Sequence, residues 1–244
     1  MQSRRIACAM WIIGLLGVPG AAWAQSPTAG ATGGSSARQT LPAPEILPRT
    51  IPIFPLQDVM LFPNLPRPLH IFEPRYRAMV ADALKGDRII GMVLLRPGYE
   101  ADYEGRPPVY PIGCAGVITD VEQLPDGRYA ILLRGLVKFR VISEDRSRAY
   151  RLARVEAMPE MPADKDGTAL RKQRARLEIL LTASSPPGSE PPPPELSDED
   201  LVNGLAQYLP IDPIDRQDLL EQGGVLSRSQ ALIDLLEKRA APRR

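Results

Sequence analysis

The sequence predicts an α+β protein in which a small closed β-barrel is followed by helices. Short apolar and alternating runs fill residues 51–158, and only one helical pattern interrupts them. Leucines at helical spacing then mark residues 168–240. With 244 residues, 44% of them hydrophobic, the chain has the length and composition of an ordinary globular protein of one or two domains.

The predicted barrel begins at residues 51–54, where prolines hold the chain extended. The apolar run 89–95 (IIGMVLL) is too short for a good helix and is typical of a strand buried on both faces. Residues 98–111 show no apolar period and predict a loop. Residues 150–157 supply the last strand.

A hairpin is predicted in the middle of this region. Residues 112–124 and 128–134 flank Asp126-Gly127, and glycine accepts the positive φ that a tight hairpin turn requires. Residues 136–142 then alternate between two faces. Val137, Phe139 and Val141 share one face, and Lys138 and Arg140 share the other.

One helix is predicted among the strands. Pro74 suits a first helical position, and Gly86 suits a helix end. Between them, apolar residues recur at three- and four-residue spacing, as a helix with one buried face requires. These residues are Tyr76, Met79, Val80, Ala83 and Leu84.

Residues 168–240 predict a C-terminal helical subdomain. The leucines on one face of its first helix are Leu170, Leu177, Leu180 and Leu181. The proline-rich residues 184–195 follow as an extended loop. Ser197 is a predicted N-cap, because the acids at 198–200 would occupy the favourable first turn of the next helix.

Two prolines predict a break within this helical subdomain. Pro210 and Pro213 lie close together after the helix that Ser197 begins, and proline cannot continue a helix interior. Further helices are predicted at 214–222 and 226–239.

Residues 1–24 predict a secretory signal peptide. Arg4 and Arg5 precede the apolar run 6–18, and Ala22-Trp23-Ala24 supplies the small-x-small pattern of a cleavage site. The run is shorter than the roughly 20 residues that span a bilayer. We therefore expect cleavage after Ala24, a periplasmic or secreted protein and no stable membrane anchor, with an uncleaved N-terminal anchor as the alternative.

A disordered linker is predicted at residues 25–50, which are rich in Gly, Ser, Thr, Ala and Pro. Cleavage after Ala24 would leave 30 − 2 = 28 basic residues against 29 acids, a formal charge of −1. Such a chain has no net field that attracts nucleic acid, so no nucleic-acid partner is expected.

Cys114 and His70 would be the remaining cysteine and histidine, too few for a zinc site. No cofactor is expected. A cation site formed by carboxylates alone is kept as an alternative.

Several motifs resemble a known family. Residues 53–56 (IFPL), 61–63 (LFP) and 68–76 (PLHIFEPRY) resemble the opening of the substrate-binding domain of Lon proteases, and most of all its small stand-alone bacterial members. Further similar segments are 91–95 (GMVLL), 112–113 (IG), 135–141 (GLVKFRV) and 208–212 (YLPID).

The resemblance implies a PUA-like pseudo-barrel followed by a C-terminal helical bundle, with polypeptide as the ligand. Two features depart from a complete Lon protease. The sequence has no G-x-x-x-x-G-K-[ST] phosphate loop, so ATP binding is not expected. The predicted signal peptide is also unlike a cytosolic protease.

Candidate polypeptide-binding residues occur in an apolar stretch that prolines interrupt. Proline keeps such a stretch out of inner strands, so its side chains would line a groove at the barrel edge. Ordinary core packing is the alternative. The candidates are Phe54, Leu61, Phe62, Leu65, Leu69 and Phe72.

Glu73, Arg75 and Tyr76 form a predicted structural motif at the start of the helix. We expect Glu73 to satisfy helix amides or to pair with an arginine. A ligand-facing ion pair is the alternative.

An enzymatic alternative would rest on Cys114 and His70. A catalytic cysteine needs a base to form its thiolate, and His70 is the single histidine. Because a lone cysteine is usually buried, no catalytic residue is assigned.

The basic residues Arg134, Lys138 and Arg140 are expected to form a solvated strand face rather than an RNA site.

The sequence therefore predicts a non-catalytic polypeptide-binding or adaptor module of the cell envelope. Its partner would be an unfolded or extended polypeptide, or an envelope protein. One alternative is a structural or regulatory interaction domain that does not bind a substrate. A Cys114–His70 hydrolase is the other.

Overall fold

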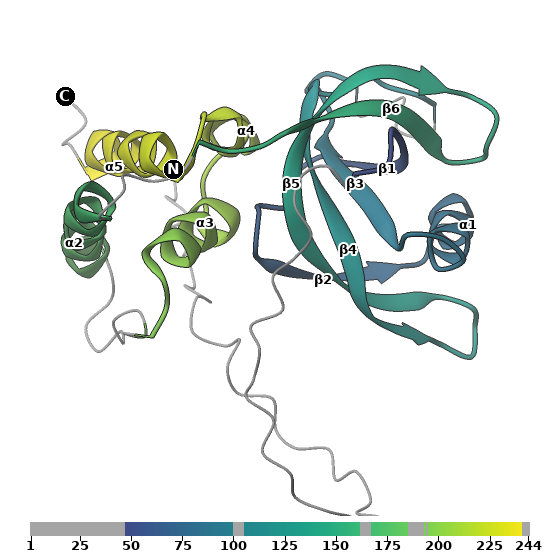
Figure 1. Ribbon diagram of the computed structural model, residues 1–244, viewed down its shortest axis with the longest axis horizontal. Coiled ribbons are helices and arrows are strands. Elements are labelled where there is room, and N and C mark those ends of the chain that lie inside the picture. Colours follow the sequence, from purple (N-terminus) through teal and green to yellow (C-terminus); the bar gives the residue numbers. More distant parts are fainter. Residues whose placement is uncertain (1–46, 100–104, 162–166, 185–192, 194, 241–244) are drawn as a thin grey trace, which may run out of the picture. The chain divides into compact units, whose positions relative to one another are not determined.

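In the computed structural model, six strands among the described residues form one mixed sheet (Figure 1). The strands are β1 (Thr50–Leu56), β2 (Pro66–Ile71), β3 (Ile89–Leu94), β4 (Ile112–Gln123), β5 (Tyr129–Asp145) and β6 (Arg151–Met158). Their order is β2-β5-β4-β3-β1-β6, and β5 also pairs with β6. The strands β5, β4, β3, β1 and β6 therefore close into a ring, with β2 attached to β5 outside it.

The structure describes residues 47–99, 105–161, 167–184, 193 and 195–240. The predicted signal peptide at 1–24, most of the predicted linker at 25–50 and most of the proline-rich loop lie outside the described residues. The first strand starts at Thr50, and Leu47 already packs against the core, so the fold begins a few residues before the predicted boundary.

Phe139 fills the inside of the ring. Its partner in the β4–β5 register is Gly113, and a Cβ at Gly113 or at Gly91 would lie within 3 Å of the Phe139 ring. Glycine at these two positions therefore makes room for the aromatic side chain. Around it lie buried aliphatic residues of the other four strands in the ring: Ile51, Ile53, Val93, Ala115, Ala153 and Val155.

The strand predictions are confirmed in type and order, with two differences. The predicted segments at 128–134 and 136–142 form one continuous strand, β5, which pairs with β2, β4 and β6. The strand β2 was not predicted, because its two prolines argue against a sheet interior. It lies at an edge of the sheet, and among the described residues its other side has no neighbouring strand. The amide hydrogens that Pro66 and Pro68 lack are therefore not needed there for pairing.

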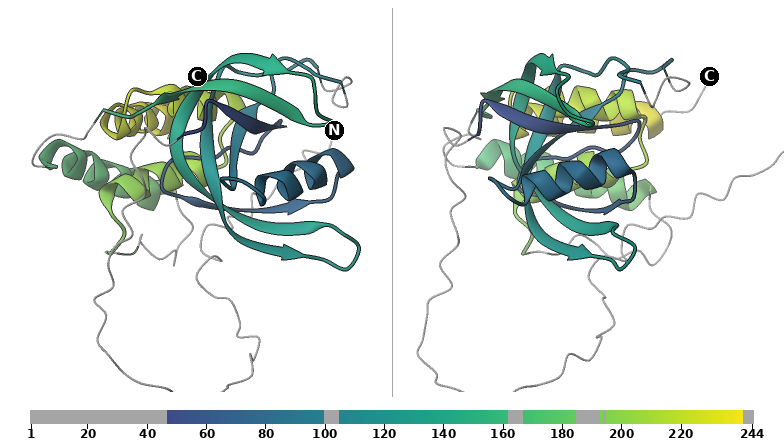
Figure 2. Two further views of the ribbon diagram at one scale, coloured as in Figure 1. Left: turned by 45° about the vertical axis from the view of Figure 1, so that its right-hand side comes forward. Right: turned by 90° about the vertical axis from the view of Figure 1, so that its right-hand side faces the viewer.

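In the part of the chain that the structure describes, five helices accompany the sheet: α1 (Pro74–Ala83), α2 (Thr168–Ser184), α3 (Asp198–Tyr208), α4 (Pro213–Glu221) and α5 (Val225–Ala240). Mixed strands and helices make this an α+β fold, as predicted. The predicted N-cap is confirmed, because the Ser197 hydroxyl accepts from the Asp200 amide at 3.0 Å. Figures 1 and 2 show α1 at one side of the sheet and α2 to α5 at the other.

One hydrophobic core joins the sheet to the helices α2–α5. Phe62 before β2, Cys114 on β4, Leu205 on α3 and Leu232 on α5 belong to the same buried cluster. All described residues also fall within one compact unit of the chain. In the part of the chain that the structure describes, none of the helices combines the length and the apolar character that crossing a bilayer would take.

Candidate polypeptide-binding site

The predicted groove residues divide into core and surface. Phe54, Leu61 and Phe62 are fully or almost fully buried, so the prediction that they line a binding groove is wrong. Leu65 and Leu69 are half-buried and pack against the same core. Phe72, 60% exposed, lies at the surface.

The helix α3 covers the apolar stretch and explains this burial. Gln207 on α3 accepts from the Phe62 amide at 2.9 Å and donates to the Pro66 carbonyl at 3.1 Å. Asn203, one turn earlier, donates to the Pro63 carbonyl at 3.2 Å. The proline-interrupted loop is therefore an internal docking surface for α3. Asn203 and Gln207, two polar residues at helical spacing among the α3 leucines, were the sequence signal for this contact.

The motif at the start of α1 is structural. Arg75 Nε donates to Glu73 Oε2 at 3.0 Å, which confirms the predicted pairing of Glu73 with an arginine. The Arg75 guanidinium lies over the Tyr76 ring, 4.6 Å from its centroid. The buried Tyr76 ring in turn lies 4.4 Å from the Phe54 ring, so the motif fixes α1 against β1.

The structure separates Cys114 from His70. Cys114 is fully buried on β4 opposite Lys138, and burial raises the pKa of its thiol far above the ordinary value. His70 is exposed on β2 opposite Ala130, near the other end of β5, and its Nε2 lies 3.2 Å from Arg128 Nη1. The pair therefore lacks the thiolate and the contact that a catalytic dyad needs.

Lys138 corrects the prediction of a solvated basic face. Arg134 and Arg140 are exposed, but Lys138 is 2% exposed because its side of β5 faces the helices α2–α5. Its Nζ lies 3.3 Å from Glu160 Oε1 and donates to the Gln222 carbonyl.

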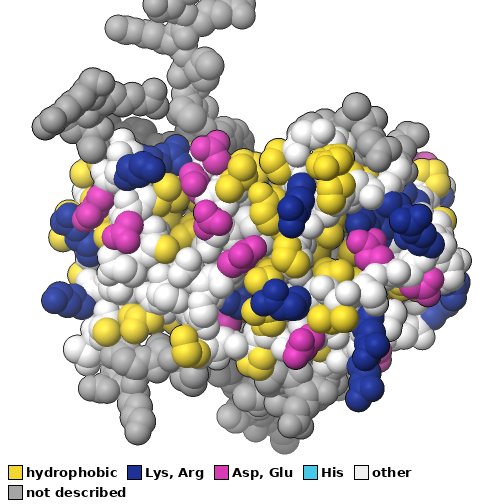
Figure 3. Space-filling view, turned by 90° about the horizontal axis from the view of Figure 1, so that it is seen from above, with side chains coloured by type: hydrophobic (Ala, Val, Ile, Leu, Met, Phe, Trp, Pro, Cys, Tyr) yellow, Lys and Arg dark blue, Asp and Glu magenta, His cyan; other side chains and the backbone are white. Residues whose placement is uncertain are grey.

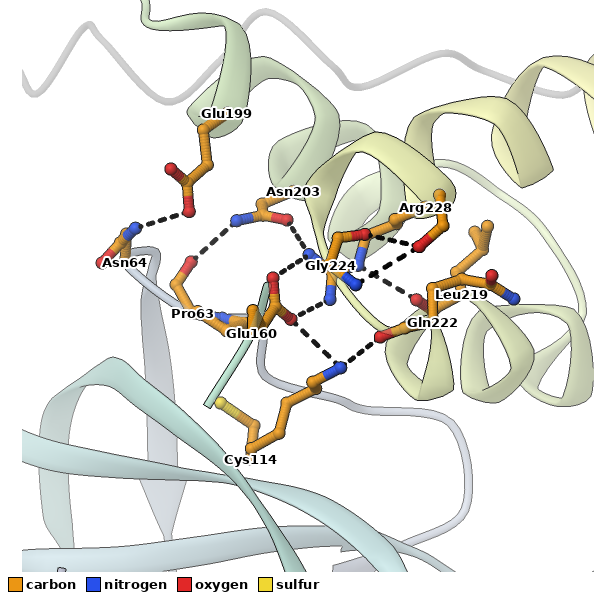
Figure 4. A network of polar contacts seen from close by, with 12 residues as sticks. Pro63, Asn64, Cys114, Glu160, Glu199, Asn203, Leu219, Gln222, Gly224 and Arg228 are labelled. Carbon is orange, nitrogen blue, oxygen red and sulfur yellow. Dashed lines mark hydrogen bonds and ion pairs between the residues drawn. The ribbon is translucent and has the colours of Figure 1, made fainter. Parts of the chain in front are cut away.

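Glu160 also accepts from Arg228 of α5, which is completely buried (Figure 4). Arg228 donates to Asn203 Oδ1 at 2.6 Å and to the Leu219 carbonyl at 3.0 Å. The Glu160 carboxylate thus forms ion pairs with two buried cations, Lys138 and Arg228, where the chain leaves β6 and meets the helices. Burial, and then the Arg228 charge, lower the pKa of Lys138 despite the attraction of Glu160. We call Lys138, Glu160 and Arg228 the junction charges.

A cleft of about 390 Å³ opens between the sheet and the start of α4. Its apolar lining includes Tyr99 and Ile214, each 48% exposed. The remaining lining residues are Gln57, Asp58, Leu94, Leu95, Arg96, Pro97, Asp212 and Pro213. Figure 3 views the side on which α4 and β6 lie in Figure 1, and hydrophobic side chains gather across its middle among charged ones.

Such a cleft can take an apolar side chain and the chain segment that carries it. Apolar walls with a few polar groups are the usual lining of a binding site. Pro97 and Pro213 stiffen its rim, which lowers the ordering cost of binding. Among the described residues, no group of three or more His, Cys, Asp or Glu side chains is placed to hold a metal ion.

Comparison with known families gives a match over most of the chain. Residues 50–238 match the ATP-dependent protease La (LON) substrate-binding domain. "Lon protease 2" of Myxococcus xanthus is 25% identical over 201 residues, which are 80% of this chain and 24% of that protein. "Lon protease 2" of Sorangium cellulosum is 32% identical over 129 residues, 53% of this chain and 16% of that protein. The chain therefore spans at most a quarter of these relatives.

Solved structures share the fold. The Lon N-terminal domain protein from Xanthomonas campestris has a TM-score of 0.53 and 23% identity, covering 76% of this chain and 97% of its own. The N-terminal domain of the Mycobacterium avium complex Lon protease has a TM-score of 0.54 and 18% identity, covering 77% of this chain and 98% of its own.

Proposed function

The chain belongs to the family of Lon substrate-binding domains, and from this premise we propose that it is a non-catalytic polypeptide-binding or adaptor module. The family description names this domain for substrate binding, which supports a binding rather than a catalytic role. We also infer that its closed sheet is a PUA-like pseudo-barrel and that α2 to α5 form a helical bundle. The expected ligand is an unfolded or extended polypeptide.

The cleft between the sheet and α4 carries this proposal. Its volume is about 390 Å³, against about 160 Å³ for a second cleft beside β1 and the end of α1. Half-exposed Tyr99 and Ile214 offer apolar area that a bound chain would bury. The edge strand β2 is a weaker candidate, because Pro66 and Pro68 remove two of its amide donors and so disfavour strand addition.

Ile214→Asp is expected to weaken binding of a fluorescent, permanently unfolded protein by about tenfold, because it replaces apolar contact with a charge that binding would desolvate. Fluorescence anisotropy measures the dissociation constant. Ile179→Asp on α2 is the matched control: its isoleucine is 60% exposed and does not line the cleft. Equal effects of the two substitutions would place binding elsewhere.

A second candidate function is a structural or regulatory interaction domain that binds one folded envelope protein. It is favoured by the exposed Phe72, which lies outside the cleft. In that case the unfolded protein would not bind, and Phe72→Asp would abolish capture of the folded partner.

We further propose that the chain acts in the cell envelope, after removal of residues 1–24. The support is the Arg4-Arg5 pair, the apolar run 6–18 and the Ala22-Trp23-Ala24 pattern. Expressed with its own N-terminus, the protein is expected in the periplasmic fraction with Gln25 as its first residue. N-terminal sequencing of that fraction checks this, and intact Met1 in the cytosol would contradict it.

A further inference from the structure

We propose that the cleft selects an extended polypeptide segment in which an apolar residue lies two positions from a lysine or arginine, and that Asp212 and Asp58 recognise the cation. This inference rests on the proposed function and names the chemistry of the ligand. Both aspartates are exposed and line the cleft together with Tyr99 and Ile214.

Asp212 is free to meet a ligand. It is the N-cap residue of α4, a position where aspartate usually accepts from the first helical amides, but its side chain makes no such hydrogen bond. Neither Asp212 nor Asp58 forms an ion pair with any residue that the structure describes. Two carboxylates therefore face the cleft without a cation in contact.

The two arginines beside the cleft, Arg96 and Arg216, already have partners within the protein. Arg96 lies over the Tyr110 ring, 5.5 Å from its centroid, and its Nε lies 3.4 Å from the Val109 carbonyl. Arg216 is buried beneath and donates to the backbone carbonyls of Asp58 at 3.0 Å and of Leu209 at 2.8 Å.

Arg216 also distinguishes the two aspartates. Burial lowers the pKa of Arg216, and the nearby charge of Asp58 raises it, so Asp58 is partly compensated from within the protein. Asp212 is therefore expected to contribute more to recognition of a ligand cation. The positive end of α4 lies here as well, but Asp215 in its first turn offsets that partial charge.

The apolar and acidic walls together define the ligand. Half-exposed Tyr99 and Ile214 favour a branched or aromatic side chain, while the carboxylates favour a neighbouring cation and oppose an acidic one. An extended segment presents side chains two residues apart on the same face, so both can enter the cleft. A folded partner would have to supply the same pair from a protruding loop, and a nucleic acid would be repelled.

Three fluorescent peptides test the inference. They share one unstructured sequence with a central leucine and differ only two positions after it, where the residue is lysine, glutamine or glutamate. At low salt the lysine peptide should bind about three- to fivefold more tightly than the glutamine peptide, the range of an exposed ion pair. The glutamate peptide should bind more weakly than both. Raised salt should remove the difference but not the binding itself.

Asp212→Asn should bring the lysine and glutamine peptides to nearly equal affinity, and Asp58→Asn should do so only in part. Asp120→Asn on β4 is the control, since it changes the net charge equally at an exposed position outside the cleft. A lysine preference that survives Asp212→Asn, or that Asp120→Asn reduces equally, would overturn the inference.

The peptides also separate the two proposals. If the glutamine peptide binds and Ile214→Asp weakens it, but lysine gives no advantage, the cleft binds polypeptide and the charge preference is wrong. If none of the three peptides binds, the proposed function fails and this inference fails with it.

Discussion

Glu160→Gln is expected to lower the free energy of unfolding by about 3–5 kcal/mol, the cost of removing one partner from a buried ion pair. The carboxylate of Glu160 contacts both Lys138 and Arg228, which are 2% and 0% exposed. Glutamine keeps the size of the side chain but removes its charge, and it replaces one of the two acceptor oxygens with an NH2 group that can only donate. In the variant, Lys138 and Arg228 would stay buried and positively charged with no carboxylate of the described residues in contact.

Urea unfolding of the purified protein, followed by circular dichroism, measures this loss. Glu237→Gln is the control, because Glu237 pairs with Arg176 at the surface, where both side chains are about half exposed. Its cost should stay below about 1 kcal/mol. If Glu160→Gln cost no more than Glu237→Gln, the backbone carbonyls around Lys138 and Arg228 would be sufficient to balance these cations.

The pH dependence of stability follows from the lowered pKa of Lys138, which burial causes. A lysine whose pKa in the folded protein lies below that in the unfolded chain destabilises the fold while it carries its proton. That penalty is relieved as pH rises through the lowered pKa towards the ordinary value. Without the attraction of Glu160 the pKa should fall further, so the Glu160→Gln variant should regain more stability at alkaline pH than the wild-type protein.

The local elements of this fold could be predicted from the sequence. The turn at Asp126-Gly127, the apolar run 89–95 and the cap at Ser197 each carry their signal within a few residues. Periodicity also placed Phe139 on the correct face of β5. These features depend on neighbouring residues alone, which explains why a single sequence is sufficient for them.

The candidate site depended on contacts between distant segments. The stretch from Leu61 to Leu69 has the composition of an exposed groove, and only the position of α3 shows that it is covered. Lys138 alternates as a surface residue would, yet its side of the strand faces Glu160 and Arg228. The cleft itself combines residues near 58, 96 and 213, and no local pattern joins these three places.

Gly135→Ala is the second substitution with a large expected effect, about 2–4 kcal/mol of destabilisation. A Cβ at Gly135 would lie 2.0 Å from the Phe62 carbonyl oxygen and 2.8 Å from its carbon. Both are backbone atoms, so no side-chain rotation relieves the overlap. The loop before β2 would have to move away from β5. That movement would strain the hydrogen bonds from the Gly135 amide to Leu65 at 2.8 Å and from the Asn64 amide to Gly135 at 3.0 Å.

The same displacement should reach α3, because Asn203 and Gln207 bind the carbonyls and an amide of this loop. Hydrogen exchange of α3 amides should therefore accelerate in Gly135→Ala more than exchange in α1, which contacts the other side of the sheet. Gly204→Ala is the control with the opposite sign. A Cβ at Gly204 meets nothing within 4 Å, and alanine in a helix interior should stabilise the protein by about 0.5–1 kcal/mol. If Gly135→Ala were tolerated as well as Gly204→Ala, or if α3 kept its protection, the loop would not be the element that docks the helices onto the sheet.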